Sequence, residues 1–196
     1  MVVSIKLNSI QNNNSSLQME IEEFVSKSAG QWSSMRSGHS LAFKQFEEIV
    51  SNIRINLLSK NDTRVEEYLA IVGYSREKVV SPFEIEWIGE SNWAGNSEIQ
   101  KQVKGHSLLI PIKYSINSGI ILRSKGYAED IQAITEYVIS SDGTIFFSSA
   151  YQQTIAEERI WFIHQNVRCR SSVIRSKSKG AILQTSFASE VRKVSK

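Results

Sequence analysis

Hydrophobic and polar residues alternate along most of this chain with a period of two, the spacing of a β-strand with one buried face. The alternation begins at Gln31 and returns in SNIRINLLS at residues 51–59. After Pro82 it recurs in further short segments, several of which are separated by Gly, Asn, Asp or Ser. The clearest hairpin turn is SDGT at residues 141–144. The pattern predicts about nine or ten strands, mostly short and joined by hairpins.

Two segments have helical spacing instead. Residues 19–30, MEIEEFVSKSAG, place acids early and a lysine late, and they end in Gly30. Residues 61–75, NDTRVEEYLAIVGYS, start with Asn and Asp and repeat apolar side chains at helical intervals. We predict a short helix in each segment, and the apolar side of the first could act as a lid.

No crossover helices separate the strands after Pro82, so the sheet is antiparallel. A sandwich and an up-and-down barrel both fit this pattern, and the small number of helices favours the barrel. The predicted fold is therefore all-β, an antiparallel up-and-down β-barrel of about 9–10 strands with two short helices. A barrel of this size commonly holds one small ligand.

Composition fits one globular domain. The 196 residues are 41% hydrophobic and 22% charged, close to ordinary globular usage. Residues 1–18 are rich in Asn and Ser and carry one charge, so we interpret them as an N-terminal extension, with the barrel domain at 19–196. We find no apolar run of membrane-spanning length and no signal-peptide pattern.

Cys169 is the one cysteine, and no Cys/His cluster has metal-ligand spacing. We therefore expect no metal site and a reducing compartment, the cytoplasm. The net charge is +3, but residues 159–196 hold nine Lys or Arg against one acid. A nucleic-acid binder is one reading of this basic end. Against it, the arginines alternate with apolar residues and no single-strand binding motif is present.

The stretch NVRCRSS at residues 166–172 carries the most specific chemistry. In a strand, Arg168, Arg170 and Ser172 share one face, and Cys169 lies on the other. If the arginines point inward, an anion must pair with them, because an unpaired buried charge costs several kcal/mol. Glu158 is a nearby acid, and two arginines suit two carboxylates of one ligand. The alternative is that this face is simply solvated, and spacing alone leaves both open.

Familiar enzyme motifs are missing. There is no G-x-S-x-G elbow, P-loop or dinucleotide fingerprint, and the three histidines stand outside any motif. Aromatic residues on different predicted strands could line one cavity, although for any single tryptophan core packing is the better explanation. They are Trp32, Trp87, Trp93, Tyr127, Tyr151 and Trp161.

Several motifs together resemble the S-type phycobiliprotein lyases, the CpcS/CpeS family. They are GQWSSMRSGHSLAF, SNIRINLL, ILRSKGYAE, ERIWF, NVRCRSS and SFASEVR, in the family's order from about Met19 to Arg192. The resemblance implies a lipocalin-like, calycin-type barrel that binds an open-chain tetrapyrrole, a bilin, as substrate without a further cofactor. It also implies an enzyme that attaches the bilin through a thioether to a cysteine of an apo-phycobiliprotein subunit.

Site residues also follow from the resemblance. Arg168 and Arg170 correspond to the anchors of the bilin propionates, with Ser172 assisting, and Glu158 to the catalytic carboxylate that faces the pyrrole nitrogens. We expect Glu158 to position the bilin, and acid catalysis by its carboxylic acid is a second role that this chemistry allows.

Trp93 in ESNWAGN resembles a tryptophan that stacks on the bilin, although Ala94 stands where the family has an acid. We add Trp87 and Tyr151 as bilin-binding residues. Cys169 occupies a position that is usually aliphatic. The reactive thiol therefore belongs to the substrate protein, by this reading, and not to this chain.

We further expect the bilin to be phycoerythrobilin, the acceptor to be a phycoerythrin-type subunit and the protein to form a homodimer. The compartment is the cytosol of a cyanobacterial-type cell, or the plastid stroma in a plastid-bearing host. A non-catalytic calycin that carries bilin, haem or a fatty acid is the alternative, because binding and transfer would use the same pocket residues. Nucleic acid and membranes are not expected as partners.

Overall fold

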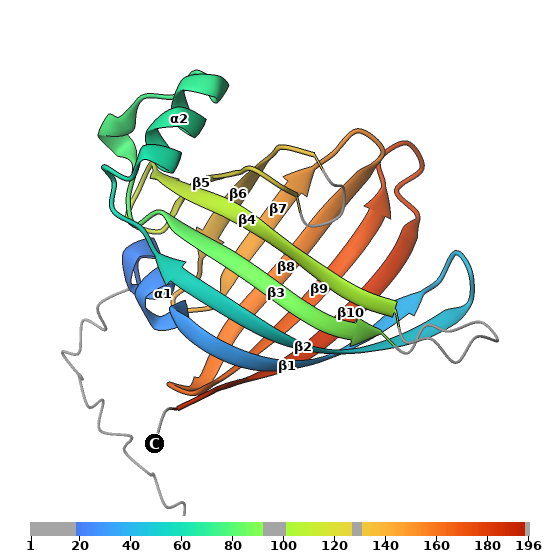
Figure 1. Ribbon diagram of the computed structural model, residues 1–196. Helices are drawn as coiled ribbons and strands as arrows, with labels where there is room; N and C mark the ends of the chain where they lie inside the picture. Colours follow the sequence, from blue (N-terminus) through green and yellow to red (C-terminus); the bar gives the residue numbers. More distant parts are fainter. Residues whose placement is uncertain (1–18, 92–100, 127–130, 195–196) are drawn as a thin grey trace, which may run out of the picture.

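A computed structural model describes residues 19–91, 101–126 and 131–194. Ten antiparallel strands follow one another in chain order and close when β1 pairs with β10 (Figure 1). The strands are β1 (Gly30–Ser40), β2 (Gln45–Leu57), β3 (Phe83–Ser91), β4 (Lys101–Lys113), β5 (Ser118–Arg123), β6 (Ala133–Ile139), β7 (Ile145–Ala150), β8 (Thr154–His164), β9 (Val167–Ser176) and β10 (Ile182–Arg192). The predicted up-and-down barrel is confirmed. The extension at 1–18 lies outside the described residues.

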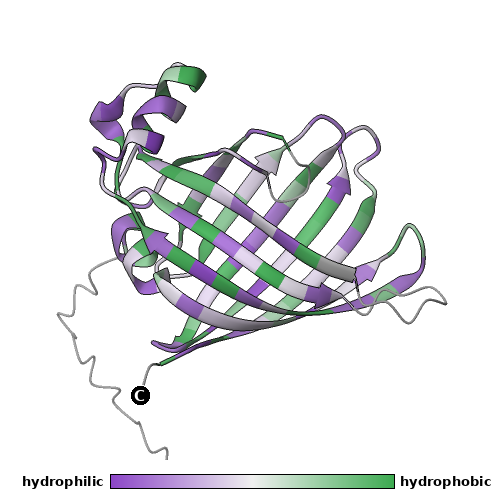
Figure 2. Ribbon diagram, viewed as in Figure 1, coloured by the Kyte–Doolittle hydropathy of each residue, from purple (hydrophilic) through white to green (hydrophobic). Residues whose placement is uncertain are grey.

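The alternation seen in the sequence is the alternation between the two faces of the barrel wall. Hydrophilic and hydrophobic residues follow one another along the strands in Figure 2. In β6 the burial pattern switches at every residue from Ala133 to Ile139. The SDGT turn joins β6 to β7, with Gly143 at a φ of 81° that favours glycine.

Helix α1 (Ile21–Ser28) closes one end of the barrel (Figure 1). Phe24 packs edge-on against Phe147 and Phe162, with ring centroids 6.2 and 5.9 Å apart. Trp32 at the start of β1 donates from its indole Nε1 to the Ser28 carbonyl at 2.9 Å. The Arg192 guanidinium donates to the carbonyls of Lys27 and Ala29. These hydrogen bonds, together with that of Trp32, fix the link between α1 and β1. The expected lid helix is thus the floor of the barrel interior.

Helix α2 (Thr63–Val72) packs on the outside of the barrel. Asp62 caps it by accepting from the Arg64 backbone N–H at 3.0 Å, and Gly73 ends it in the left-handed conformation. Together with β4 and β5 this helix forms a second apolar core, made of Val65, Tyr68, Leu69, Val79, Ile110, Ile112, Ile120 and Leu122. A 3₁₀ turn, η1 (Arg76–Lys78), follows it. Within the described ranges, no helix is long and apolar enough to cross a membrane.

Candidate functional site

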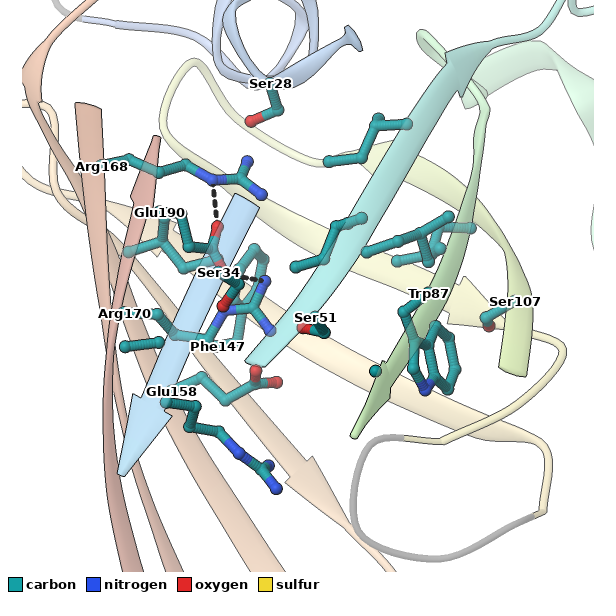
Figure 3. Close-up of a pocket in the computed structure, with 18 of the residues that line it drawn as sticks. Ser28, Ser34, Ser51, Trp87, Ser107, Phe147, Glu158, Arg168, Arg170 and Glu190 are labelled. Atoms are coloured by element: carbon teal, nitrogen blue, oxygen red, sulfur yellow. Dashed lines mark hydrogen bonds and ion pairs between the residues drawn. The ribbon is translucent and has the colours of Figure 1, made fainter. Parts of the chain in front are cut away.

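A cavity of about 390 Å³ occupies the barrel interior, within the range usual for small-molecule sites. It extends from Ser28 of α1 to Lys125 and Gly126, which follow β5 at the opposite end of the barrel. Figure 3 shows Arg168, Arg170, Glu190 and Glu158 on one side of it, facing Trp87 and Ser107 across the space. Charged and aromatic side chains therefore share one interior volume.

The two arginines of NVRCRSS both point inward from β9. Arg168 is 1% exposed, and its Nε donates to Glu190 Oε2 at 2.5 Å. Arg170 Nη2 lies 3.5 Å from the other carboxylate oxygen of Glu190. The solvated-face alternative is thus excluded. The acid that forms ion pairs with the arginines is Glu190 on β10, however, and not Glu158 as the sequence suggested.

Burial and charge act in opposite directions within this group. Desolvation lowers the pKa of Arg168 to about 10, while the Glu190 carboxylate opposes that shift, so the guanidinium stays charged near neutral pH. Desolvation would raise the pKa of Glu190, but the charges of Arg170 and Arg168 outweigh it. The pKa of Glu190 therefore lies below its usual value, and this carboxylate is ionised together with both arginines.

Glu158 lies on β8, where its side chain is 3% exposed and lines the cavity as predicted. Its described ion pair is with Arg123 at the end of β5, where Nη2 is 3.4 Å from Glu158 Oε2. The Arg123 guanidinium also stands over the Phe147 ring, 5.6 Å from its centroid. The carboxylate proposed for the pyrrole nitrogens thus has a cationic partner of its own.

The opposite wall is mostly apolar. Trp87 of β3 lines the cavity, and Gly105 is its partner residue on β4. A Cβ at Gly105 would overlap the Trp87 indole, so glycine leaves room for this ring. Around it lie the inward side chains of β2, β3 and β4, namely Ile49, Ile53, Ile55, Phe83, Ile85, Val103 and Leu109.

Three other predicted residues are not brought into this group. Ser172 is buried on the same strand as the arginines, but its Oγ lies 2.6 Å from Ser186 Oγ and it does not line the cavity. Tyr151 is buried in a separate small cluster with Ala133 and Ala156, away from the lining. Trp93 falls outside the described residues. Of the six predicted ligand-binding residues, the structure places Arg168, Arg170 and Trp87 at the cavity.

Sequence reasoning missed four charged residues of the lining, which are Arg36, Arg123, Lys125 and Glu190. Glu190 was visible as the one acid of the basic C-terminal region, within SFASEVR. Arg123 stands in ILRSKGYAE, and Arg36 in GQWSSMRSGH. Arg36 Nη2 lies 3.5 Å from Glu47 Oε2 on β2. The motifs contained the signal, but only barrel closure shows which strands face each other.

Cys169 lies on the outer face of β9, as expected. It is 5% exposed and stands opposite Trp161 on β8 and Ser189 on β10. Trp161 also faces outward, with its ring 6.1 Å from that of Phe187, so it does not line the cavity. In the part of the chain that the structure describes, no group of three or more His, Cys, Asp or Glu side chains could hold a metal ion.

Several known proteins are similar to this chain in sequence. The family model described as "CpeS-like protein" matches residues 20–193. A protein named chromophore lyase CpcS/CpeS 3, from Trichodesmium erythraeum (strain IMS101), is 44% identical over 176 residues, which cover 89% of this chain and 99% of that protein. A relative from Microchaete diplosiphon, whose name refers to a phycoerythrobilin lyase CpeS, is 37% identical over 77% of this chain and 66% of its own length.

A solved structure extends the match to three dimensions. The S-type phycobiliprotein lyase CPES from Guillardia theta superposes with a TM-score of 0.78 at 33% identity, covering 91% of this chain and 95% of that one. Sequence and fold thus lead to one assignment: this chain belongs to the CpeS-like family of phycobiliprotein chromophore lyases.

Proposed function

We propose that this chain binds phycoerythrobilin in the barrel and catalyses its attachment to a cysteine of an apo-phycobiliprotein subunit of the phycoerythrin type. The observation that carries the proposal is the pair of inward arginines around Glu190. The described lining holds Arg36, Arg123, Lys125, Arg168 and Arg170 against Glu158 and Glu190, an excess of positive charge inside a closed barrel. A bilin with two propionates supplies the matching negative charge.

Arg168 has hydrogen-bonding capacity left for such a ligand. Arg168 Nη2 is buried and has no hydrogen-bond partner among the described residues. Glu190 neutralises part of the group before the ligand arrives, so the cost of burying two like charges is already partly offset in the folded protein. In our proposal the propionates bind here, while the flat ring system lies against Trp87 and the isoleucines of the other wall.

The reaction itself is an addition. The acceptor cysteine sulfur forms a bond to the ethylidene carbon of ring A, its proton ends on the bilin, and nothing is released. A free bilin is flexible and would add thiols without stereochemical control. The barrel accelerates the reaction by fixing one conformer, with the propionates at the arginines and the pyrrole N–H groups at Glu158. Proton donation by Glu158 is a further part of the proposal.

Phycoerythrobilin, rather than another bilin, is favoured by the name of the Microchaete diplosiphon relative.

We propose a homodimer as well, since Met35 and Val50, which are paired in register on the outer face, are 69% and 59% exposed. Light scattering coupled to size exclusion measures this directly, and a monomer mass would contradict it. A cytoplasmic or stromal location remains a proposal, which fractionation of the source cells would test.

Titration with phycoerythrobilin, followed by addition of apo-phycoerythrin subunit, tests the function. We expect a red-shifted, sharpened absorbance band that co-elutes with the protein, and then a covalent adduct on the subunit that survives acid denaturation. A carrier would form the complex but no adduct. If no bilin is bound, the proposal is wrong.

A further inference from the structure

Arg123 ends β5 and places its guanidinium inside the cavity, where no role has yet been assigned to it. The residue is 9% exposed, and it lies across the interior from the arginines of β9 in the order of the strands. Its Nη2 donates to Glu158 Oε2 at 3.4 Å, and its Cζ lies over the Phe147 ring. Three strands, β5, β7 and β8, therefore meet at this one guanidinium.

Glu158 and Arg123 form an ion pair of their own, next to the arginine group of β9. The described ion pairs of Arg168 and Arg170 both go to Glu190. The described ion pair of Glu158 goes to Arg123, and the Nε of Arg123 has no hydrogen-bond partner among the described residues. The contact with Glu158 is thus the polar contact that holds the Arg123 head group, and it restrains the Glu158 carboxylate in return.

We propose that Arg123 is a positioning residue for Glu158. A glutamate has three rotatable side-chain bonds, and an unrestrained carboxylate in a cavity would populate several rotamers. The ion pair with Arg123, itself fixed on Phe147, selects the rotamer that presents Glu158 to the ligand. This inference rests on the proposed function, in which Glu158 faces the pyrrole nitrogens of the bilin.

A double-mutant cycle separates this role from direct contact between Arg123 and the ligand. The proteins are wild type, Arg123→Gln, Glu158→Gln and the double variant, with Arg123→Lys as the conservative replacement. For each, the dissociation constant and absorbance maximum of bound phycoerythrobilin are measured, and then the rate of covalent transfer. Arg159→Gln is the matched control, because Arg159 stands over Phe146 on the outer face of β8.

We expect Arg123→Gln to lower the maximal transfer rate about tenfold while the dissociation constant changes by less than about threefold. The absorbance maximum should move to that of Glu158→Gln, and Arg123→Lys should restore part of the rate. In the Glu158→Gln background, the second substitution should change the rate by less than about twofold. The proposal would be overturned if the fold-losses in transfer rate of the two single variants multiplied in the double variant. It would also be overturned if Arg123→Gln transferred the bilin at the wild-type rate.

Failure of the positioning role and failure of the proposed function give different results. If the wild type transfers bilin but the two substitutions act independently, only the role of Arg123 is wrong. If the wild type binds bilin and transfers none, the lyase function is wrong, and the absorbance maxima of the four proteins still decide whether Arg123 acts through Glu158. If the wild type binds no bilin, both proposals are wrong.

Discussion

The two walls of the cavity use the same backbone geometry for opposite chemistry. On β8, β9 and β10 the inward positions hold Glu158, Arg168, Arg170 and Glu190. On β2, β3 and β4 they hold mainly isoleucine, leucine, phenylalanine and tryptophan. The apolar wall follows the ordinary rule for barrel interiors, whereas the charged wall violates it and needs compensation from the protein or from a ligand.

The difference between the two walls indicates which kind of ligand fits the cavity. A ligand that was apolar throughout would leave the charged wall without a partner, and a small anion would leave the other wall bare. A molecule with carboxylates at one edge and an extended apolar body satisfies both walls. The charged wall should therefore dominate recognition, and the apolar wall should contribute affinity in proportion to area.

Removing both anchors should have the largest effect. Arg168→Ala with Arg170→Ala should weaken bilin binding by about 100-fold or more, because each charge-assisted hydrogen bond contributes roughly 1.5–3 kcal/mol. Absorbance titration measures the affinity, and circular dichroism checks that the barrel still folds. Arg175→Ala is the control, since Arg175 pairs with Glu157 at 2.9 Å and is partly exposed. Unchanged binding in the double variant would remove the arginines from the site.

Glu190→Gln tests the compensation inside the charged wall. It should lower the free energy of unfolding by about 3–5 kcal/mol near neutral pH, because it leaves two arginines without their carboxylate. The folded-state pKa of Glu190 lies below its usual value of 4.5, so its contribution to stability is present above that value and is lost as the pH falls through the folded pKa.

Urea unfolding of both proteins between about pH 7 and pH 3 measures this difference. The gap between wild type and Glu190→Gln should be widest near neutrality and should narrow in acid. A gap of constant size across the whole range would contradict the ionised state of Glu190.

The apolar wall should respond more weakly. Ile85→Ala removes methyl and methylene groups from the cavity lining, which costs about 1–1.5 kcal/mol and so weakens bilin binding roughly tenfold. The absorbance maximum of the bound bilin should stay in place, because the polar contacts remain. Ile88→Ala, at a half-exposed position on the outer face of the same strand, should leave the affinity unchanged. An equally large loss in both variants would mean that the effect is structural.

Cys169→Ala should have the smallest effect. The thiol is buried on the outer face of the charged wall, so it reaches neither the cavity nor a bound bilin. Transfer of the bilin to the acceptor should proceed at the wild-type rate, with a loss in stability of about 1 kcal/mol. A variant that still binds bilin but transfers none would show that Cys169 takes part in the reaction.

Local patterns were sufficient for the elements and for the two faces of each strand. Alternation in NVRCRSS placed Arg168 and Arg170 on one face and Cys169 on the other, and the structure has that arrangement. The Asn and Asp at the start of residues 61–75 predicted the beginning of a helix, and the structure has a helix capped by Asp62. These features depend on side-chain direction and capping, which neighbouring residues determine.

Partnerships inside the cavity were beyond the sequence. Nearness along the chain suggested that Glu158 answers the arginines of β9, but Glu190, 22 residues after Arg168, takes that position. Glu158 meets Arg123, which precedes it by 35 residues. Ser172 and Tyr151 were predicted to bind the ligand from their types and motifs, yet they do not line the cavity.

The sequence by itself therefore determined the strand pattern, the barrel class, the family and which side chains of NVRCRSS share one face, whereas the structure showed that the arginine face points inward. Only the tertiary structure decided which acid neutralises which arginine and how far along each strand the cavity extends. The physical reason is that the register of each hairpin, together with the closure of β1 on β10, sets the distances between side chains of different strands. Those distances depend on the whole circuit of ten strands, and no local stretch of sequence contains them.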